Sequence, residues 1–400
     1  MSTDAAPWFE APSLRTEETR TATRLELFFD LAFVLAIAEV AAVLKGHLDL
    51  PGAVEFVGLF TLIWLAWAQF TLYANRFDTD DLIYRCAKFA SMAAVLGSAA
   101  SMSGALDTHA TAFALSYLAG RVVLATLYGR AWWHVEEARP TLQVYLAASV
   151  LVAVLWAASL AVPTPARFGV WALAALVDLA APVLASRRGG HAPLHLEHLP
   201  ERFALLVILV LGEVTAATVA GVHLAAWEPG SVMIAGAGFI VAAALWWTYF
   251  DVGAVVSTNA LQDADDESRE SAEAAESDGV STDERHDLFV YAHLPVTAGI
   301  VATGVGIEEL ITHPSSDLPT SGSWCAILGL VAFLLGSVVV QGGTRRRFDR
   351  ALMWPGSVVP VLLLLGWLAP SSALAFTILV ALALAATAAA GTVLLRRTPR

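Results

Sequence analysis

The sequence predicts an all-α protein, a polytopic transmembrane helix bundle of about twelve helices. Of the 400 residues, 57% are hydrophobic and only 15% are charged, whereas soluble domains carry about 25% charged residues. Apolar runs of about 20 residues recur along the chain, and each can cross about 30 Å of hydrocarbon as a helix. Because these runs lack the alternation of barrel strands, helices in a lipid bilayer are the expected structure.

Twelve apolar segments are predicted to cross the membrane, in the order in which they follow the short polar N-terminal region. They cover residues 25–44, 51–73, 86–104, 109–129, 143–162, 168–186, 203–221, 231–250, 289–310, 322–340, 354–369 and 371–395. The eleventh segment is short, and Pro370 adjoins the twelfth, so this pair is the least regular part of the prediction. The glycines between Gly299 and Gly306 indicate close packing of the ninth segment against another helix.

The basic residues predict the orientation of the bundle, because lysine and arginine accumulate in the cytoplasmic loops of membrane proteins. With the N-terminus inside and twelve spans, only Lys45 and Arg167 of the 23 basic residues fall in outside loops. Arg121 falls deep within a span, and Lys88, at the cytoplasmic start of the third segment, is counted with the inside residues. This alternation predicts a multi-pass protein of the bacterial plasma membrane with both termini in the cytoplasm.

The chain is predicted to consist of five parts, separated by changes in polarity. Residues 257–287, between the eighth and ninth helices, hold eleven carboxylates against two arginines and few large apolar groups. They cannot bury enough surface to order themselves, so we predict a disordered cytoplasmic loop. The parts are a cytoplasmic N-terminal segment (1–24), helices one to eight (25–256), the acidic loop (257–287), helices nine to twelve (288–395) and a cytoplasmic tail (396–400).

Three short matches suggest an internal duplication. They recur in the same order in the first and second halves, and they predict two parallel six-helix repeats, a plan common in transporters. The matched segments are 29–40 with 203–214, 65–70 with 245–250, and 81–84 with 287–291.

Ionisable side chains within the predicted spans are the candidate functional residues, because a charge at the centre of a bilayer costs about 2.5–3.5 kcal/mol. Helical rise places Arg121, Asp178 and Glu213 at similar depths. One interpretation is a structural ion pair of Arg121 with Asp178 or Glu213. The other leaves one carboxylate free to exchange a proton or bind a cation.

The first predicted helix is unusual because it carries two carboxylates near its start. Glu26 and Asp30 are spaced to share one face of the helix, and Asp30 lies about 9 Å inside by helical rise. Glu26 also suits a structural role, since anions stabilise a helix N-terminus. We predict that Asp30 and Glu213 contact a transported ion or solute, with Arg202 and His293 supporting them and His293 able to face Asp30.

Three histidines precede the seventh span. The spacing of His191, His195 and His198 would place three imidazoles on one helical face, as a zinc site requires. Gly190 and Pro193 argue against a regular helix there, so we predict no metal site and no cofactor. The sequence contains no P-loop, no His-Glu-x-x-His motif and no nucleophile elbow, so a catalytic site of the kind found in soluble enzymes is not indicated.

Several of these segments resemble motifs of one family. Residues 25–34 resemble the first-helix signature of the bacterial low temperature requirement protein A (LtrA) family. The chain departs from the family's helix-seven motif at Val214, where a small polar residue is expected after Gly212 and Glu213. The resemblance implies a multi-pass membrane protein without an assigned substrate. The other matching segments are 75–81, 198–203 with 211–213, 249–251 and 291–295.

The preferred hypothesis is a protein that moves a cation, a proton or a small solute through a polar intramembrane site. A fainter similarity links Arg24, Phe28 and Asp30 to potassium channels whose units open with Arg-x-x-x-Phe-Ser-Asp, with Phe29 in place of the serine. The alternatives are a non-transporting membrane scaffold or stress sensor and a membrane-embedded lipid-modifying enzyme. The expected partners are the lipid bilayer, a cation or small-molecule substrate and a second copy of the chain, but no nucleic acid.

Overall fold

The computed structural model describes most of the chain. It covers residues 7–15, 23–186, 198–254, 282–314, 318, 320–343, 354–368 and 372–397. Within these ranges the chain forms twelve α-helices, three shorter helical segments and a single pair of two-residue strands. The prediction of an all-α bundle is confirmed.

The helices follow the predicted segments in order. They are α1 (Arg24–Gly46), α2 (Leu50–Arg76), α3 (Leu82–Ala100), α4 (Ala110–His134), α5 (Arg139–Ser159), α6 (Ala166–Ser186), α7 (His198–Leu224), α8 (Pro229–Trp247), α10 (Thr282–Thr312), α11 (Thr320–Gly343), α12 (Val359–Leu368) and α13 (Ala373–Arg397). The shorter segments are η1 (Met102–Gly104), η2 (Thr248–Ala254) and η3 (Trp354–Val358), and the strands are β1 (Ser13–Leu14) and β2 (Phe77–Asp78).

Ten helices of the described residues are long and apolar enough to cross a membrane. The two others are α3 and α12. Helix α12 has only 10 residues, although it directly follows the 3-10 turn of η3. Helix α3 carries Arg85 and Lys88 near its start. Both correspond to predicted segments, so the order of helices agrees with the prediction while their lengths vary.

Helix α3 begins at Leu82, earlier than the predicted start at residue 86. Asp81 caps this helix, because its carboxylate oxygen Oδ1 accepts a hydrogen bond of 2.8 Å from the backbone N–H of Tyr84. Such a cap satisfies a backbone donor that the first turn leaves free. The hydropathy pattern misses this start because the first two turns of α3 are not uniformly apolar.

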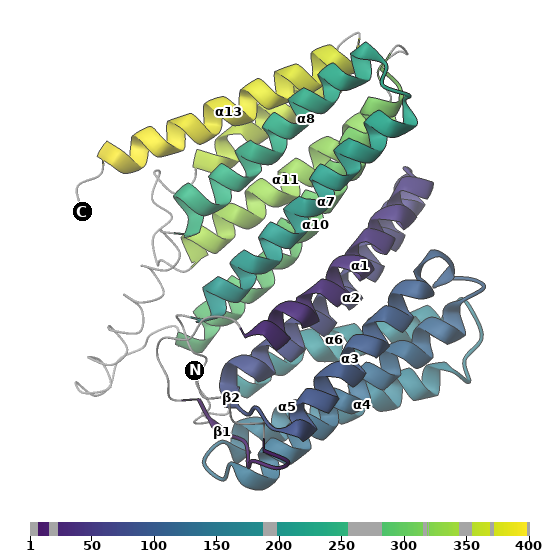
Figure 1. Cartoon of the computed structure of the whole chain (residues 1–400), viewed down its shortest axis with the longest axis vertical. Coiled ribbons are helices and arrows are strands. Elements are labelled where there is room, and N and C mark those ends of the chain that lie inside the picture. Colours follow the sequence, from purple (N-terminus) through teal and green to yellow (C-terminus); the bar gives the residue numbers. More distant parts are fainter. Residues whose placement is uncertain are drawn as a thin grey trace. The chain divides into compact units, whose positions relative to one another are not determined.

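The chain divides into two compact units, one of Met1–Val43 with Phe56–Arg202 and the other of Leu44–Glu55 with Phe203–Arg400. In the first unit α3, α4, α5 and α6 pack in sequence, and in the second α10 packs along α11 and α8 along α13 (Figure 1). The boundary between Arg202 and Phe203 falls in the first turns of α7, close to the boundary between the two predicted repeats. The duplication itself stays a prediction.

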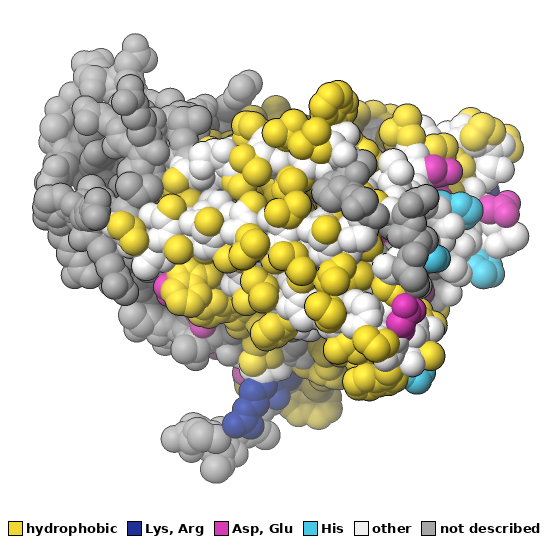
Figure 2. Space-filling model, turned by 90° about the horizontal axis from the view of Figure 1, so that it is seen from above, with side chains coloured by type: hydrophobic (Ala, Val, Ile, Leu, Met, Phe, Trp, Pro, Cys, Tyr) yellow, Lys and Arg dark blue, Asp and Glu magenta, His cyan; other side chains and the backbone are white. Residues whose placement is uncertain are grey.

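Large apolar side chains lie on the outer surface of many helices. Phe239 of α8 and Leu382 of α13 are 60% and 61% exposed. Figure 2 looks onto the side of the second unit that carries these two helices, and apolar side chains cover most of it while acidic and histidine side chains gather towards one end. A surface of this kind is typical of helices that face hydrocarbon.

The acidic loop lies mainly outside the described residues, which resume at Thr282. Helix α10 begins there, so the last residues of the predicted loop, 282–287, are helical. The predicted disorder of the remaining loop stays a prediction.

Candidate functional site

Asp30 lies at the centre of a buried polar cluster in the first unit. Its oxygen Oδ1 accepts a hydrogen bond of 2.7 Å from Nη2 of Arg202 and one of 2.9 Å from Nε1 of Trp67. The Asp30 side chain is 1% exposed and that of Arg202 8%. One carboxylate oxygen on α1 thus accepts a charged hydrogen bond from the start of α7 and a neutral one from α2.

Lys88 adds a second cation beside this ion pair. Its ammonium nitrogen lies 3.5 Å from the ring centroid of Phe29 and 5.5 Å from that of Phe70, and the residue is 1% exposed. Its charge also interacts with those of Arg202, Glu26 and Asp30. We refer to Asp30, Trp67, Lys88 and Arg202 as the Asp30 cluster.

The Asp30 cluster retains unused hydrogen-bonding capacity. Oδ2 of Asp30 and Nη1 of Arg202 are both buried without a hydrogen-bond partner among the described residues. Buried polar atoms in proteins are nearly always satisfied by protein groups, by water or by a ligand, so these two atoms can each accept such a partner. A free acceptor beside a free donor suits the uptake of a proton or of a small polar ligand.

Glu26, another predicted site residue, takes part in the start of α1. Its carboxylate oxygen Oε2 accepts a hydrogen bond of 2.8 Å from the backbone N–H of Thr23, and Thr23 Oγ1 accepts one of 3.2 Å from the backbone N–H of Glu26. This reciprocal arrangement is a capping box. Glu26 also interacts electrostatically with Asp30, so a supporting role in the site stays a prediction.

Glu213 belongs to the second unit, whereas Asp30 belongs to the first. Its charge interacts with that of Glu308, and Glu308 accepts a hydrogen bond from Lys45 at the end of α1. The structure therefore associates Glu213 with a carboxylate and a lysine that the sequence did not single out. A shared site with Asp30 stays a prediction.

His293 also belongs to the second unit, where both of its ring nitrogens are engaged. Nδ1 lies 2.7 Å from the carbonyl oxygen of Phe289, and Nε2 lies 2.7 Å from the hydroxyl of Tyr249. A carbonyl only accepts, so Nδ1 carries a proton, and in the neutral ring the Tyr249 hydroxyl donates to Nε2. This arrangement fixes the orientation of the imidazole.

Arg121 and Asp178 form a second buried ion pair in the first unit. Nη2 of Arg121 lies 2.6 Å from Oδ1 of Asp178, and both side chains are 3% exposed. Gln69 donates a hydrogen bond of 3.4 Å to the backbone carbonyl of Asp178. Of the two partners predicted for Arg121, the structure brings Asp178 to it.

The histidines considered for a metal site provide no test of that idea. His191 and His195 lie outside the described residues, and the side chain of His198 at the start of α7 is likewise not described. In the described part of the chain, no group of three or more His, Cys, Asp or Glu side chains is placed to hold a metal ion.

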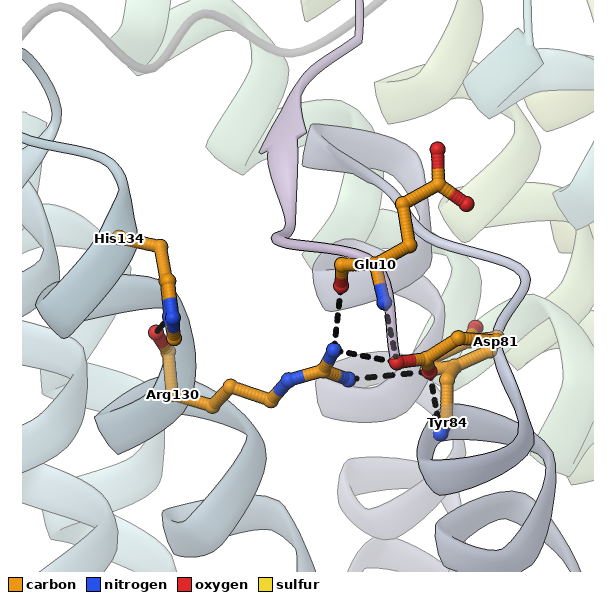
Figure 3. Close-up of polar contacts among 5 residues, drawn as sticks. All are labelled: Glu10, Asp81, Tyr84, Arg130 and His134. Carbon is orange, nitrogen blue, oxygen red and sulfur yellow. Dashed lines mark hydrogen bonds and ion pairs between the residues drawn. The ribbon is translucent and has the colours of Figure 1, made fainter. Parts of the chain in front are cut away.

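The N-terminal segment is fastened to the first unit by a second polar arrangement, shown in Figure 3. Arg130 of α4 pairs with both carboxylate oxygens of Asp81 and donates to the carbonyl of Glu10. The backbone N–H of Glu10 donates a hydrogen bond of 3.0 Å to Oδ2 of Asp81. Asp81 and Arg130 together thus bind the peptide backbone at Glu10, and we call these three residues the N-terminal clamp.

Contacts on either side of the clamp extend it. The ring of Phe9 lies 5.2 Å from the guanidinium of Arg130 and packs on the ring of His134. Further along the segment, β1 pairs with β2, and Arg15 donates a hydrogen bond of 2.9 Å to the carbonyl of Ala74. Residues 1–24 show only a polar composition in the sequence, and no pattern there predicts this docking.

Acidification is expected to release the N-terminal clamp. Burial alone would raise the pKa of Asp81, but hydrogen bonds from Arg130, Glu10 and Tyr84 outweigh this effect and hold that pKa below its usual value of 3.8. The clamp therefore contributes its full stability above about pH 3.8, where an unfolded chain would also be ionised, and loses it as the pH falls through the lower folded-state pKa. Protease cleavage of residues 7–15, followed against pH, measures this release.

The variant Asp81→Asn should release the segment at neutral pH, because it removes charged hydrogen bonds that each contribute about 1.5–3 kcal/mol. Asp80→Asn is the matched control, since Asp80 pairs with Arg85 at an exposed position and such pairs contribute little. Equal cleavage rates in Asp81→Asn and the wild type would contradict the assignment.

Comparison with known proteins identifies the family. A family model described as bacterial low temperature requirement A protein (LtrA) matches residues 21–393. The chain belongs to this family. An uncharacterized protein of Rhizobium meliloti (strain 1021) is 26% identical to this LtrA chain over 333 residues, which cover 81% of the chain and 77% of that protein. No solved structure matches the chain significantly.

Two members of the Asp30 cluster lie in segments that resemble motifs of the LtrA family. Asp30 lies in the segment that resembles the first-helix signature of the family, and Arg202 lies in the segment that resembles its helix-seven motif. The ion pair between them joins two segments on which the resemblance depends. Trp67 and Lys88 lie outside the segments that resemble the family. Trp67 belongs to segment 65–70 of the predicted duplication, but no sequence pattern assigned either residue to a site.

Proposed function

We propose that this LtrA-family membrane protein moves protons, together with a small solute, through the Asp30 cluster in a bacterial plasma membrane, with both termini in the cytoplasm. The observation that carries the proposal is the buried ion pair between Asp30 and Arg202, in which one carboxylate oxygen and one guanidinium nitrogen lack hydrogen-bond partners within the described part of the chain. Ionisable groups kept inside membrane bundles commonly belong to proton or substrate pathways.

Protonation of Asp30 would change the cluster in a defined way. A neutral carboxyl group no longer compensates the charge of Arg202, so the ion pair loses most of its attraction. Loss of the proton restores the pair. The cluster therefore has two charge states, and a bundle whose helices are joined by this pair can couple them to two arrangements.

The test is proton flux in liposomes that contain the purified full-length protein and a pH-sensitive dye. Asp30→Asn keeps a side chain that can hydrogen-bond to Trp67 and Arg202 but cannot exchange a proton. Its flux should fall to the level of empty liposomes. Asp80→Asn is the control and should retain wild-type flux, since Asp80 is exposed and paired with Arg85.

Two results would contradict the proposal. One is wild-type flux in Asp30→Asn. The other is a wild-type protein that passes no more than empty liposomes under proton, sodium, potassium and chloride gradients. If Asp30→Asn lowers only the thermal stability, the ion pair fixes helix packing, as the scaffold hypothesis predicts.

A further inference from the structure

We propose that Lys88 and Arg202 form a binding site for a small carboxylate anion, which fills when Asp30 takes up a proton. This inference rests on the proposed function and names the class of solute that moves with the proton. It depends on three observations about the Asp30 cluster: its charge balance, its unused donors and its aromatic wall.

The charge balance of the cluster is positive. Lys88 and Arg202 supply two cations, and Asp30 supplies one carboxylate. Glu26, the next carboxylate, is partly exposed and accepts a hydrogen bond from the backbone of Thr23. When Asp30 is protonated, Arg202 loses its ion-pair partner, and Lys88 keeps only its interaction with the partly exposed Glu26 among the described carboxylates that act on it. An uncompensated charge within a membrane bundle is costly. An incoming anion would remove that cost.

The donors needed to hold an anion are available. Nη1 of Arg202 is buried without a hydrogen-bond partner in the described chain. The Lys88 ammonium, which has three donors, makes no hydrogen bond or ion pair with any residue that the structure describes. The Lys88 ammonium lies over the face of Phe29, and a ring face attracts a cation.

The geometry favours a carboxylate over a spherical ion. Nη2 of Arg202 already binds one oxygen of Asp30. Once that carboxyl group is neutral, Nη1 and Nη2 can hold both oxygens of a second carboxylate, the pairing that a guanidinium forms best. Phe29 and Phe70, which contact each other and Lys88, provide an apolar wall for a short hydrocarbon group.

Because each event favours the other, proton and anion binding should be reciprocally linked. A proton on Asp30 raises the affinity for the carboxylate, and a bound carboxylate favours the protonated form of Asp30. The expected activity is therefore the movement of a proton and a small carboxylate in the same direction.

The test uses pyruvate as the probe, in liposomes that contain the full-length protein. An inward proton gradient should drive uptake of radiolabelled pyruvate, and pyruvate should in turn accelerate proton entry. Lys88→Met should reduce both to the level of empty liposomes, whereas Lys88→Arg should retain part of the uptake. Arg85→Met is the control on the same helix and should match the wild type, because Arg85 is exposed and its ion-pair partner in the described chain is Asp80.

Asp30→Asn provides an independent readout if Lys88→Met fails to fold. Its neutral amide resembles protonated Asp30, so it should still exchange labelled for unlabelled pyruvate across the membrane, while a pH gradient should no longer drive accumulation. Loss of exchange together with loss of coupling would contradict the charge argument.

The outcomes separate this inference from the function on which it rests. If proton flux depends on Asp30 but pyruvate neither moves nor accelerates it, only the carboxylate site is wrong. If chloride moves in a Lys88-dependent manner and pyruvate does not, the assigned ligand class is wrong. If Asp30→Asn leaves proton flux unchanged, both proposals fail.

Discussion

Replacing Arg121 with methionine is expected to lower the free energy of unfolding by about 3–5 kcal/mol, because it leaves the carboxylate of Asp178 buried without its counter-charge. The two side chains are 2.6 Å apart and each is 3% exposed. Gln69 reaches only the backbone carbonyl of Asp178, so it cannot replace the lost charge. The measurement is chemical unfolding of the purified protein in detergent micelles.

The matched comparison is the double variant Arg121→Met with Asp178→Leu, which removes both charges together. It should recover much of the loss, since exchanging a buried pair for apolar side chains of similar volume is often close to neutral. Arg85→Met breaks an exposed pair and should change the free energy of unfolding by less than about 1 kcal/mol. A single variant at Arg121 that unfolds like Arg85→Met would show that the pair does not stabilise the bundle.

The helices were predictable because each one is an apolar run that is continuous in the sequence. Every predicted span corresponds to a helix, since a segment in hydrocarbon must satisfy its backbone internally. The boundaries were harder to predict where a side chain decides them. Asp81 starts α3 early by capping it, and the capping box of Thr23 and Glu26 starts α1 at Arg24.

The site was predictable only in part, because side-chain partnerships link distant positions. Asp30 and Arg202 could be identified as candidates from their types and depth, but their pairing spans 172 positions of the chain. Lys88 counts only as a cytoplasmic charge at the start of the third predicted segment, since its charge suits the positive-inside rule. Its burial against Phe29 depends on tertiary packing that no periodicity records.

The N-terminal clamp is a second arrangement whose side-chain partners could not be predicted from the sequence. The segment 75–81 resembled a family motif, yet the sequence offered no partner for Asp81. That partner is Arg130, which was counted only as a cytoplasmic charge. A polar residue in a loop has no hydropathy signal that separates a solvated charge from a buried one, so the clamp emerges only when α3 and α4 pack together.

Replacing Gly306 with alanine is expected to destabilise the second unit by about 3 kcal/mol, the upper part of the range for overpacking. A Cβ atom at Gly306 would lie 2.4 Å from the backbone nitrogen of Ala326 and 2.6 Å from the carbonyl oxygen of Gly322. Backbone atoms of α11 cannot rotate away as a side chain can, so the two helices must separate. The glycines of this region were predicted to mark close packing. Gly299 and Gly306 face α11, whereas Gly304 faces Val214 of α7.

A matched control shows why this effect belongs to the contact and not to the residue type. Gly236 of α8 has nothing within 4 Å of a built Cβ atom, so Gly236→Ala should stabilise the protein by about 0.5–1 kcal/mol through better helix propensity. Gly299→Ala should resemble Gly306→Ala, since its Cβ atom would lie 2.4 Å from the carbonyl oxygen of Gly329. Chemical unfolding in micelles compares the three variants. Opposite signs for Gly306→Ala and Gly236→Ala are the expected result, and equal stabilisation by both would mean that α10 and α11 do not approach this closely.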